Sequence, residues 1–234
     1  MFKRSYVDQG RDPEFMNNPV LSIIVSEKDI KTGVSFLIGQ CPYMEKVYQK
    51  TGMPPLRLRA SGFEGLARII VGQQVSVASA NAIWAKFSGF LGEVTVENCQ
   101  SKTEEALRGC GVSRPKVRTL LAVCDAATSG ELNFDRFSDL SYEGVHDILT
   151  RVKGIGPWTS DVYAMFCLGH SDAWAPGDLA LQYAVQEVLS LDEKPDGKAM
   201  TEHAERWRPW RGVAARMLWA YYSDMKANKS GVPV

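Results

Sequence analysis

Two short segments of the sequence carry residue types that could do chemistry. In the first, Gly154 and Gly156 flank one aliphatic residue directly ahead of a predicted helix start. Glycines leave backbone N–H groups uncovered, and such groups at a helix N-terminus attract an anion such as phosphate. In the second, Asp178 follows a Pro-Gly pair and precedes another predicted helix. The helix dipole keeps a carboxylate at that position ionised, so it can stabilise positive charge that develops in a reaction.

Each segment also has a purely structural interpretation. A Gly-x-Gly connection can serve helix packing alone, and an aspartate ahead of an apolar-periodic helix is often a plain N-cap. For Asp178 both roles can hold together. In a phosphate-binding hairpin, Ile155 packs inward, while the two glycine N–H groups and the hydroxyls of Thr159 and Ser160 face the phosphate. Such a contact positions a nucleic acid without reading its sequence.

Helices must position these residues, because apolar side chains recur at helical spacing from Phe63 onward. Only residues 21–25 and 56–58 look extended, so no sizeable β-sheet is expected. Residues 141–168 have the form of a helix, a tight hairpin and a second helix. The sequence predicts an all-α protein. Beyond residue 100, the predicted helices cover residues 103–108, 115–128, 141–151, 158–168, 179–189 and 203–226.

The chain divides into a tag and two lobes. Residues 1–15 are interpreted as an expression tag, because the RDPEF stretch at 11–15 is what adjoining BamHI and EcoRI cloning sites can encode. Residues 62–169 are expected to form a middle helical lobe that carries the hairpin. Residues 16–61 and 170–234 are expected to form the second lobe from both ends of the chain.

Composition limits the classes of function. Lys plus Arg equals Asp plus Glu at 27 each, so affinity for nucleic acid must come from local patches such as the one around Lys116. The five cysteines are scattered without the close spacing of a metal or iron-sulfur site. No apolar run could span a membrane, and no signal peptide opens the chain. We therefore expect an intracellular protein with reduced thiols.

Four motifs in order resemble the AlkA-type 3-methyladenine DNA glycosylases of the helix-hairpin-helix glycosylase superfamily. The resemblance extends from about residue 55 to residue 222, and it implies an all-α, two-lobed fold with the active site in the cleft between the lobes. Too few residues precede Phe63 for the β-rich N-terminal domain of a larger enteric relative, so the chain looks like a compact form. The motifs are GQQVS at 72–76, KGIGPWTS at 153–160, PGDL at 176–179 and ERWRPWR at 205–211.

The resemblance implies roles for individual residues. Asp178 matches the catalytic carboxylate that faces C1′ of a nucleotide rotated out of the duplex. Trp158 occupies the position where bifunctional relatives carry a Schiff-base lysine, so the resemblance implies a monofunctional enzyme. Trp158 and Trp219 match base-pocket positions, and Tyr163 and Trp174 are weaker candidates recommended by proximity alone. Electron-rich aromatic walls attract N-alkylated purines because these bases are cationic.

The remaining implications concern DNA. Gln73 and Gln74 match the turn that enters the minor groove, and Gln74 matches the wedge that fills the gap left by the extruded base. The expected partner is double-stranded DNA containing alkylated bases, bound by a monomer in a bacterial cytoplasm without cofactor, metal or membrane. Two alternatives stay open: a glycosylase for deaminated or oxidised bases, with or without lyase activity, and a non-catalytic helix-hairpin-helix protein that recognises DNA structure.

Overall fold

The computed structural model describes residues 23–230, and this part of the chain is almost entirely helical. The prediction of an all-α protein is confirmed, since the described residues contain only an isolated β-bridge between Ile23 and His170. Within the same range, no helix is long and apolar enough to cross a membrane. The tag predicted at residues 1–15 lies outside the described range.

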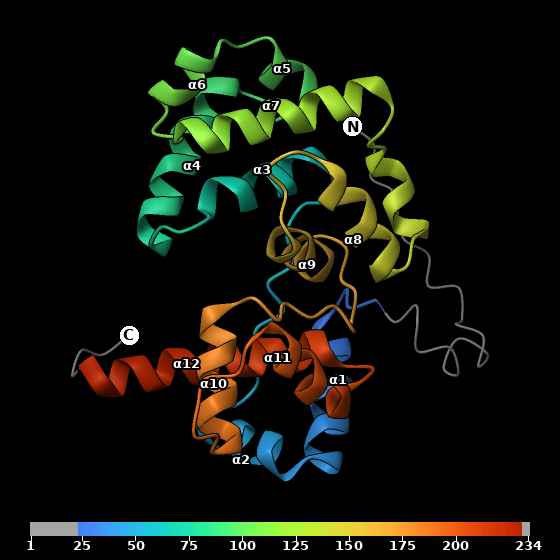
Figure 1. Cartoon of the computed structure of the whole chain (residues 1–234), viewed down its shortest axis with the longest axis vertical. Helices are drawn as coiled ribbons and strands as arrows, with labels where there is room; N and C mark the ends of the chain where they lie inside the picture. The colour runs from blue at the N-terminus through green and yellow to red at the C-terminus, as the bar shows by residue number, and fades with distance from the viewer. Residues whose placement is uncertain (1–22, 231–234) are drawn as a thin grey trace.

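Short helices follow one another through the whole described chain (Figure 1). In chain order they are α1 (Glu27–Gln40), α2 (Pro42–Thr51), α3 (Gly62–Gly72), α4 (Val77–Leu91), α5 (Val96–Gln100), α6 (Glu104–Gly109), α7 (Arg114–Ser129), the 3-10 helix η3 (Phe134–Asp139), α8 (Tyr142–Arg151), α9 (Pro157–Phe166), α10 (Leu179–Leu189), α11 (Gly197–Ala204), the 3-10 helix η4 (Glu205–Trp207) and α12 (Arg211–Ser230).

Polar N-caps start the helices that matter for the site. The Ser76 hydroxyl accepts from the Ser79 N–H at the start of α4, and the Ser141 hydroxyl accepts from the Gly144 N–H at the start of α8. Pro157 begins α9, where the missing N–H costs no helical hydrogen bond. Of the six helices predicted beyond residue 100, the first five agree with the structure to within two residues at each end.

The predicted helix at 203–226 is wrong as one element. The chain leaves α11 at Ala204, passes through η4, and begins α12 only at Arg211. Pro209 explains the break, because proline lacks the N–H that a continuing helix needs and pushes Arg208 out of the helical region, to a ψ of 143°. The sequence interpretation also missed α1 and α2, which precede the periodic region.

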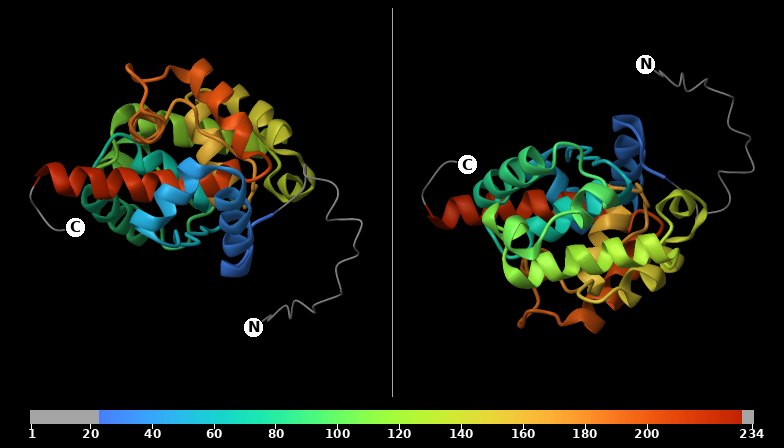
Figure 2. Two further views of the ribbon diagram at one scale, coloured as in Figure 1. Left: turned by 90° about the horizontal axis from the view of Figure 1, so that it is seen from below. Right: turned by 90° about the horizontal axis from the view of Figure 1, so that it is seen from above.

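The helices form two groups that Figure 1 shows one above the other, with α9 near the centre. In the upper group α3 packs against α4, α7 and α9, while α5 and α6 pack against α7. In the lower group α12 packs against α1, α2 and α10. Figure 2 shows α12 running along the molecule with α1 and α2 beside it in the view from below. A division into 62–169 and 16–61 with 170–234 remains our proposal.

Buried contacts hold α12 against the segment that leads to Asp178. Arg211 makes a two-pronged ion pair with Asp172, from Nε to Oδ1 at 2.9 Å and from Nη2 to Oδ2 at 2.8 Å. Arg216 donates from Nη2 to the Met165 carbonyl at 2.9 Å and thereby ties α12 to α9. Burial lowers the pKa of Arg216 to about 10. These bonds hold α12 against α9 and against the segment that precedes α10.

Candidate active site

Asp178 is the point where three helices meet. It is the N-cap of α10, and its Oδ1 accepts a hydrogen bond from the Leu181 N–H at 2.9 Å. The indole Nε1 of Trp158, in the first turn of α9, donates to Oδ2 at 2.8 Å. The indole Nε1 of Trp219, on α12, donates to Oδ1 at 3.1 Å. Three N–H donors therefore hold one half-buried carboxylate in a fixed orientation.

Only donors surround this carboxylate. Every hydrogen bond to the Asp178 side chain comes from an N–H group, so both of its oxygens act as acceptors. The N-terminus of α10 adds its partial positive charge. A fixed anion with this support can stabilise a cationic centre that forms within reach of its free lone pairs.

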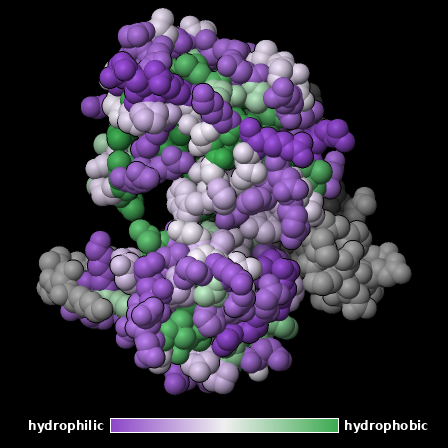
Figure 3. All heavy atoms as spheres, viewed as in Figure 1, coloured by the Kyte–Doolittle hydropathy of each residue, from purple (hydrophilic) through white to green (hydrophobic). Residues whose placement is uncertain are grey.

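Asp178 and both tryptophans line a cleft of about 790 Å³ between the two groups of helices. Figure 3 shows the hollow at the left of the molecule, between the upper and lower masses of atoms. Its walls come from the segment before α3, from α3, α4 and α9, and from the facing surfaces of α10 and α12. The cleft is large enough for a flat heteroaromatic group with its attached sugar.

Aromatic rings and arginines share the walls of this cleft. Phe166 packs beside Trp219 with ring centroids 5.5 Å apart. The guanidinium of Arg59 lies 5.8 Å from the Phe166 centroid, and that of Arg68 lies 5.4 Å from the Trp84 centroid. The site can therefore stack a planar ring and attract negative charge at the same time.

Tyr163 and Trp174 do not line the cleft. The Tyr163 side chain is fully buried, and its hydroxyl accepts from the Gly62 N–H at 2.9 Å. Trp174 packs edge-on against Trp207, with ring centroids 5.4 Å apart. Both rings fill the core because their positions on the helix and loop point inward, which nearness to the motifs in sequence does not reveal. We leave both residues out of the base pocket proposed below.

The hairpin between α8 and α9 differs in part from the expected phosphate contact. Ile155 is buried, and neither glycine N–H donates to a protein acceptor within the described residues. Thr159 and Ser160, in contrast, are buried rather than turned outward. Their positions in the first turn of α9 face the core, so the expectation that their hydroxyls meet a phosphate is not supported.

The turn between α3 and α4 separates the roles of its two glutamines. The Gln73 side chain donates from Nε2 to Thr159 Oγ1 at 2.7 Å and so connects this turn to the hairpin. Gln74 is exposed and has a φ of 53°, in the left-handed region that few side chains adopt. Lys116 donates from Nζ to the Val71 carbonyl at 2.8 Å, so its ammonium is already held at the end of α3.

A buried polar cluster lies behind the site on α9. Burial raises the pKa of Asp161 to about 7, although a hydrogen bond from Tyr142 and the charge of Arg211 oppose the shift. The Tyr142 hydroxyl lies 2.7 Å from Asp161 Oδ1 and 3.0 Å from the Trp174 carbonyl. His146 Nε2 is 3.8 Å from the same Asp161 oxygen. The cluster does not line the cleft.

Three residues of the cleft had no place in the sequence interpretation. Arg57, Arg59 and Arg68 line the wall formed by the loop before α3 and by α3 itself. Alternation of basic and other residues at 57–59, just ahead of a helix start, was the available signal.

The described residues bring no group of three His, Cys, Asp or Glu side chains together in a way that could hold a metal ion.

Comparisons with known proteins give the same family from sequence and from fold. A family model described as HhH-GPD superfamily base excision DNA repair protein matches residues 67–209. DNA-3-methyladenine glycosylase 1 of Schizosaccharomyces pombe is 30% identical over 161 residues, which cover 67% of this chain and 71% of that protein.

Two solved structures share the fold over most of the chain. The 3-methyladenine DNA glycosylase of S. pombe in complex with abasic DNA has a TM-score of 0.74 at 28% identity and covers 80% of this chain and 95% of that one. A DNA-3-methyladenine glycosidase from Bacillus halodurans has a TM-score of 0.72 at 30% identity, with coverage of 83% and 90%.

Proposed function

Because this chain belongs to the HhH-GPD superfamily of base excision DNA repair proteins, we propose that it is a monofunctional DNA glycosylase that removes alkylated purines from duplex DNA. Its similarity to 3-methyladenine DNA glycosylases supports 3-methyladenine as a substrate. We include 7-methylguanine because it is also a cationic N-alkylated purine that an aromatic-walled cleft attracts. The observation that carries the proposal is one carboxylate, Asp178, held by two indole N–H groups and a helix N-terminus in an aromatic-walled cleft.

The chemistry follows from that carboxylate. After the damaged nucleotide has rotated out of the duplex, the bond between C1′ and the purine nitrogen lengthens, and positive charge develops on the sugar. Asp178 stabilises this charge electrostatically, as carboxylates do for the sugar cation in glycoside hydrolysis. The bonding electrons leave with the purine, and water adds to C1′ and loses a proton. An abasic site remains in an uncut strand.

An alkylated purine needs little help to leave. Alkylation gives the base a positive charge, so the departing group becomes neutral without protonation by a general acid. The faces of Trp158 and Trp219 attract the same cation by stacking and by their quadrupoles. Their ring faces serve the base while their indole N–H groups serve Asp178.

The amine needed for strand cleavage is absent from the hairpin position. Trp158 takes that place, and Lys153 precedes the hairpin rather than following it. A tryptophan cannot form a Schiff base with C1′. We therefore propose that the protein has no lyase activity.

DNA contacts follow from the exposed turns. The hairpin N–H groups of Gly154 and Gly156 bind a backbone phosphate, and exposed Gln74 enters the minor groove at the extruded nucleotide. Gln73 supports this turn through its bond to Thr159. One copy of the chain carries all of these groups, so the active species is a monomer.

A panel of duplexes, each with one modified base, tests the proposal. The unaltered protein is incubated with duplexes containing 7-methylguanine, hypoxanthine, 8-oxoguanine or no lesion, and the freed base and abasic site are quantified. Release of 7-methylguanine without strand cleavage is expected. Release of 8-oxoguanine together with a borohydride-trapped adduct would instead favour an oxidised-base glycosylase with lyase activity, and binding without release from any duplex would favour a non-catalytic DNA-binding protein.

A further inference from the structure

Three arginines in the cleft stand apart from the other arginines near the two lobes' contact. Arg57, Arg59 and Arg68 line the same wall and are exposed to the cleft, and none of their guanidinium groups has a hydrogen-bond or ion-pair partner among the described residues; Arg59 lies over the Phe166 ring and Arg68 over the Trp84 ring. By contrast, Arg211 is paired with Asp172, and Arg216 is bonded to backbone carbonyls. Guanidinium groups that face a cleft without an acidic partner are available to an anionic ligand, whose oxygens match their fork of donors.

Arg59 lies in a locally positive part of the cleft. Partial desolvation lowers its pKa, the neighbouring Cys167 opposes the shift, and the charges of Arg68 and Arg57 lower the pKa further. Arg59 therefore lies close enough to both arginines to be repelled by them. Glu64 also lines the cleft but forms no ion pair with any of them within the described residues. A ligand with negative charge would relieve the repulsion.

The backbone presents these side chains in a fixed way. The Arg59 N–H donates to the Phe166 carbonyl at 2.8 Å, which anchors the loop to the end of α9. Arg57 has a φ of 50°, a conformation that a non-glycine residue adopts only when its surroundings impose it. The Leu56 carbonyl accepts from Arg216 Nε at 3.4 Å. The loop is therefore part of the framework of the cleft.

We propose that Arg57, Arg59 and Arg68 form a phosphate-binding wall of the cleft that holds the backbone of the extruded nucleotide. This inference rests on the proposed function, because it takes DNA with a rotated-out nucleotide as the ligand. The inference also accounts for how a cationic base can enter a cleft lined by arginines. The positive charge of the three arginines would repel an alkylated base, but two or three phosphates bound to the arginines neutralise that charge.

The wall differs from the hairpin in what it can reach. Lys153 and Gly154 of the hairpin are exposed, so the hairpin contacts the backbone of any duplex. The wall lies in the cleft with Asp178, so only a strand whose nucleotide has left the stack approaches it. The arginines should therefore contribute to the preference for a lesion as well as to overall affinity.

Salt-dependent binding measures this contribution. Dissociation constants are determined by fluorescence anisotropy over a range of KCl concentrations for two labelled duplexes, one with a central tetrahydrofuran abasic analogue and one undamaged. For the triple variant Arg57→Gln, Arg59→Gln, Arg68→Gln on the abasic duplex, the plot of log K against log[KCl] should be less steep by about 2 to 3. Each phosphate contact contributes about 0.9 to the magnitude of that slope. Its preference for the abasic duplex should fall about tenfold or more.

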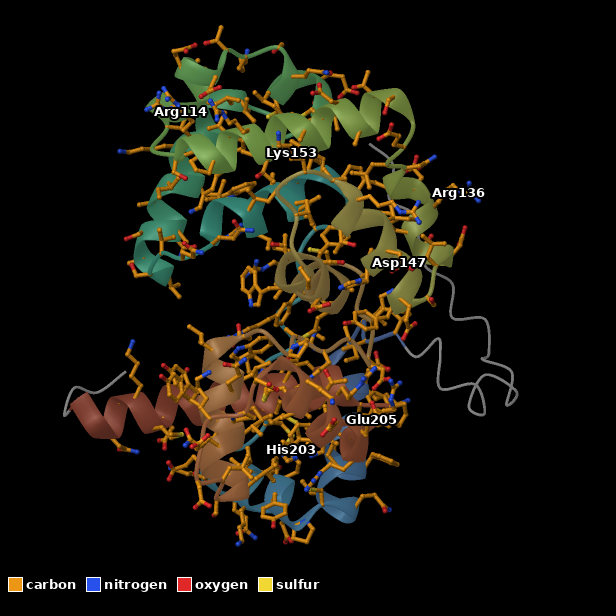
Figure 4. The ribbon with its side chains drawn as sticks, in the orientation of Figure 1. Arg114, Arg136, Asp147, Lys153, His203 and Glu205 are labelled. Carbon is orange, nitrogen blue, oxygen red and sulfur yellow. The ribbon has the colours of Figure 1, made fainter. Side chains whose placement is uncertain are left out.

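Single-residue variants distinguish the effect of these three arginines from the general effect of removing a positive charge. Arg136→Gln removes one exposed arginine of η3 that does not line the cleft and lies at the far right in Figure 4, so it should leave the preference unchanged. Lys153→Gln should weaken binding to both duplexes alike. Arg59→Lys keeps the charge and should retain the slope that Arg59→Gln loses. Thermal unfolding confirms that each variant is folded.

The outcomes distinguish this inference from the proposed function. An unchanged slope and preference in a folded triple variant would overturn the phosphate wall, as would an equal loss in Arg136→Gln. The assay needs no base release. If the unaltered protein prefers the abasic duplex but frees no base from the 7-methylguanine duplex, the proposed function fails while the wall stands.

Discussion

At the scale of single residues, the site depends on indole N–H groups as much as on ring faces. Trp158 and Trp219 reach Asp178 from α9 and α12, and together with the Leu181 amide they surround the carboxylate with donors. The proposed stacking of a base uses the ring faces of these two side chains. Their N–H groups orient the anion at the same time.

Replacing each tryptophan by phenylalanine separates the two tasks. Trp158→Phe and Trp219→Phe keep an aromatic face but remove one hydrogen bond to a charged group, worth about 1.5 to 3 kcal/mol. The single-turnover rate of 7-methylguanine release should fall about 10- to 100-fold, while the dissociation constant for the duplex changes little. Trp158→Ala should impair both. A Phe variant with an unaltered rate, or one that loses only binding, would mean that the indole N–H groups do not support the carboxylate.

The buried Asp161 makes a separate prediction about pH and stability. Its pKa is about 7 in the folded protein, compared with an ordinary value of 3.8. Between these two pH values, Asp161 is protonated in the folded protein and ionised in the unfolded chain. The resulting stability is full below the ordinary value and is lost as the pH rises through about 7. The unfolding free energy of Asp161→Asn minus that of the unaltered protein should therefore grow by up to a few kcal/mol between about pH 4 and 7.

Denaturant unfolding of both proteins across this pH range provides the test. His170 does not confuse it, because burial lowers the pKa of that histidine in both proteins and its effect cancels in the difference. His146 also faces Asp161, and the double variant with His146→Gln removes its influence. A difference that stays constant with pH would show that Asp161 is ionised in the folded protein at neutral pH.

The sequence singled out the candidate carboxylate, Asp178, but it said little about which side chains surround that carboxylate. Asp178 could be located because an N-cap position and an ordered motif both point to one residue. Tyr163 and Trp174 could not be judged, because sequence nearness says nothing about which side of a helix or loop faces the core. The cleft arginines were missed because their partner is absent from the chain itself.

At the scale of elements, the hairpin between α8 and α9 depends on one glycine more than on the other. Gly154 has a φ of 92°, and a Cβ there would overlap the Thr119 hydroxyl on α7. Gly156 has a φ of −96°, and a Cβ there would meet nothing within 4 Å. The pair of glycines is thus unequal in a way that the Gly-x-Gly pattern does not reveal.

Alanine at each position should therefore have different effects. Gly154→Ala combines backbone strain with a clash against α7, and it should lower the unfolding free energy by about 2 to 4 kcal/mol and weaken binding to undamaged duplex. Gly156→Ala should change stability by less than about 1 kcal/mol. Denaturant unfolding and duplex binding of the two variants check this. Equal destabilisation by both substitutions would contradict the geometry of the hairpin.

Element prediction succeeded where a cap and an apolar stripe were weighed together. The helix at 179–189 has a capping aspartate and a regular apolar stripe, and α10 has those bounds. The predicted helix at 203–226 has the stripe but contains Pro209, and the proline determines the outcome. The signals for α1 were present and were overlooked, since Ser26 and Asp29 form a capping box ahead of an apolar stripe that begins at Ile30.

At the scale of the whole molecule, the chain has no net charge, but charged side chains gather in its cleft. The total of 27 basic and 27 acidic residues gives no net field, yet three unpaired arginines and one oriented carboxylate face the same space of about 790 Å³. Sequence motifs predicted that the fold has such a cleft. They could not predict its lining, because its walls come from segments as far apart as residues 57 and 223.

The most direct test compares the two carboxylates of the cleft. Asp178→Asn keeps the size of the side chain and one of its two acceptor oxygens but removes the charge, whereas Glu64→Gln removes the other charge that lines the same space. Single-turnover release of 7-methylguanine is measured at saturating enzyme, with binding to the abasic duplex as the check on folding. If Asp178 stabilises the sugar cation, Asp178→Asn loses at least about 100-fold in rate and still binds DNA, while Glu64→Gln stays within about fivefold. An Asp178→Asn protein that released the base at the normal rate would contradict this role of Asp178.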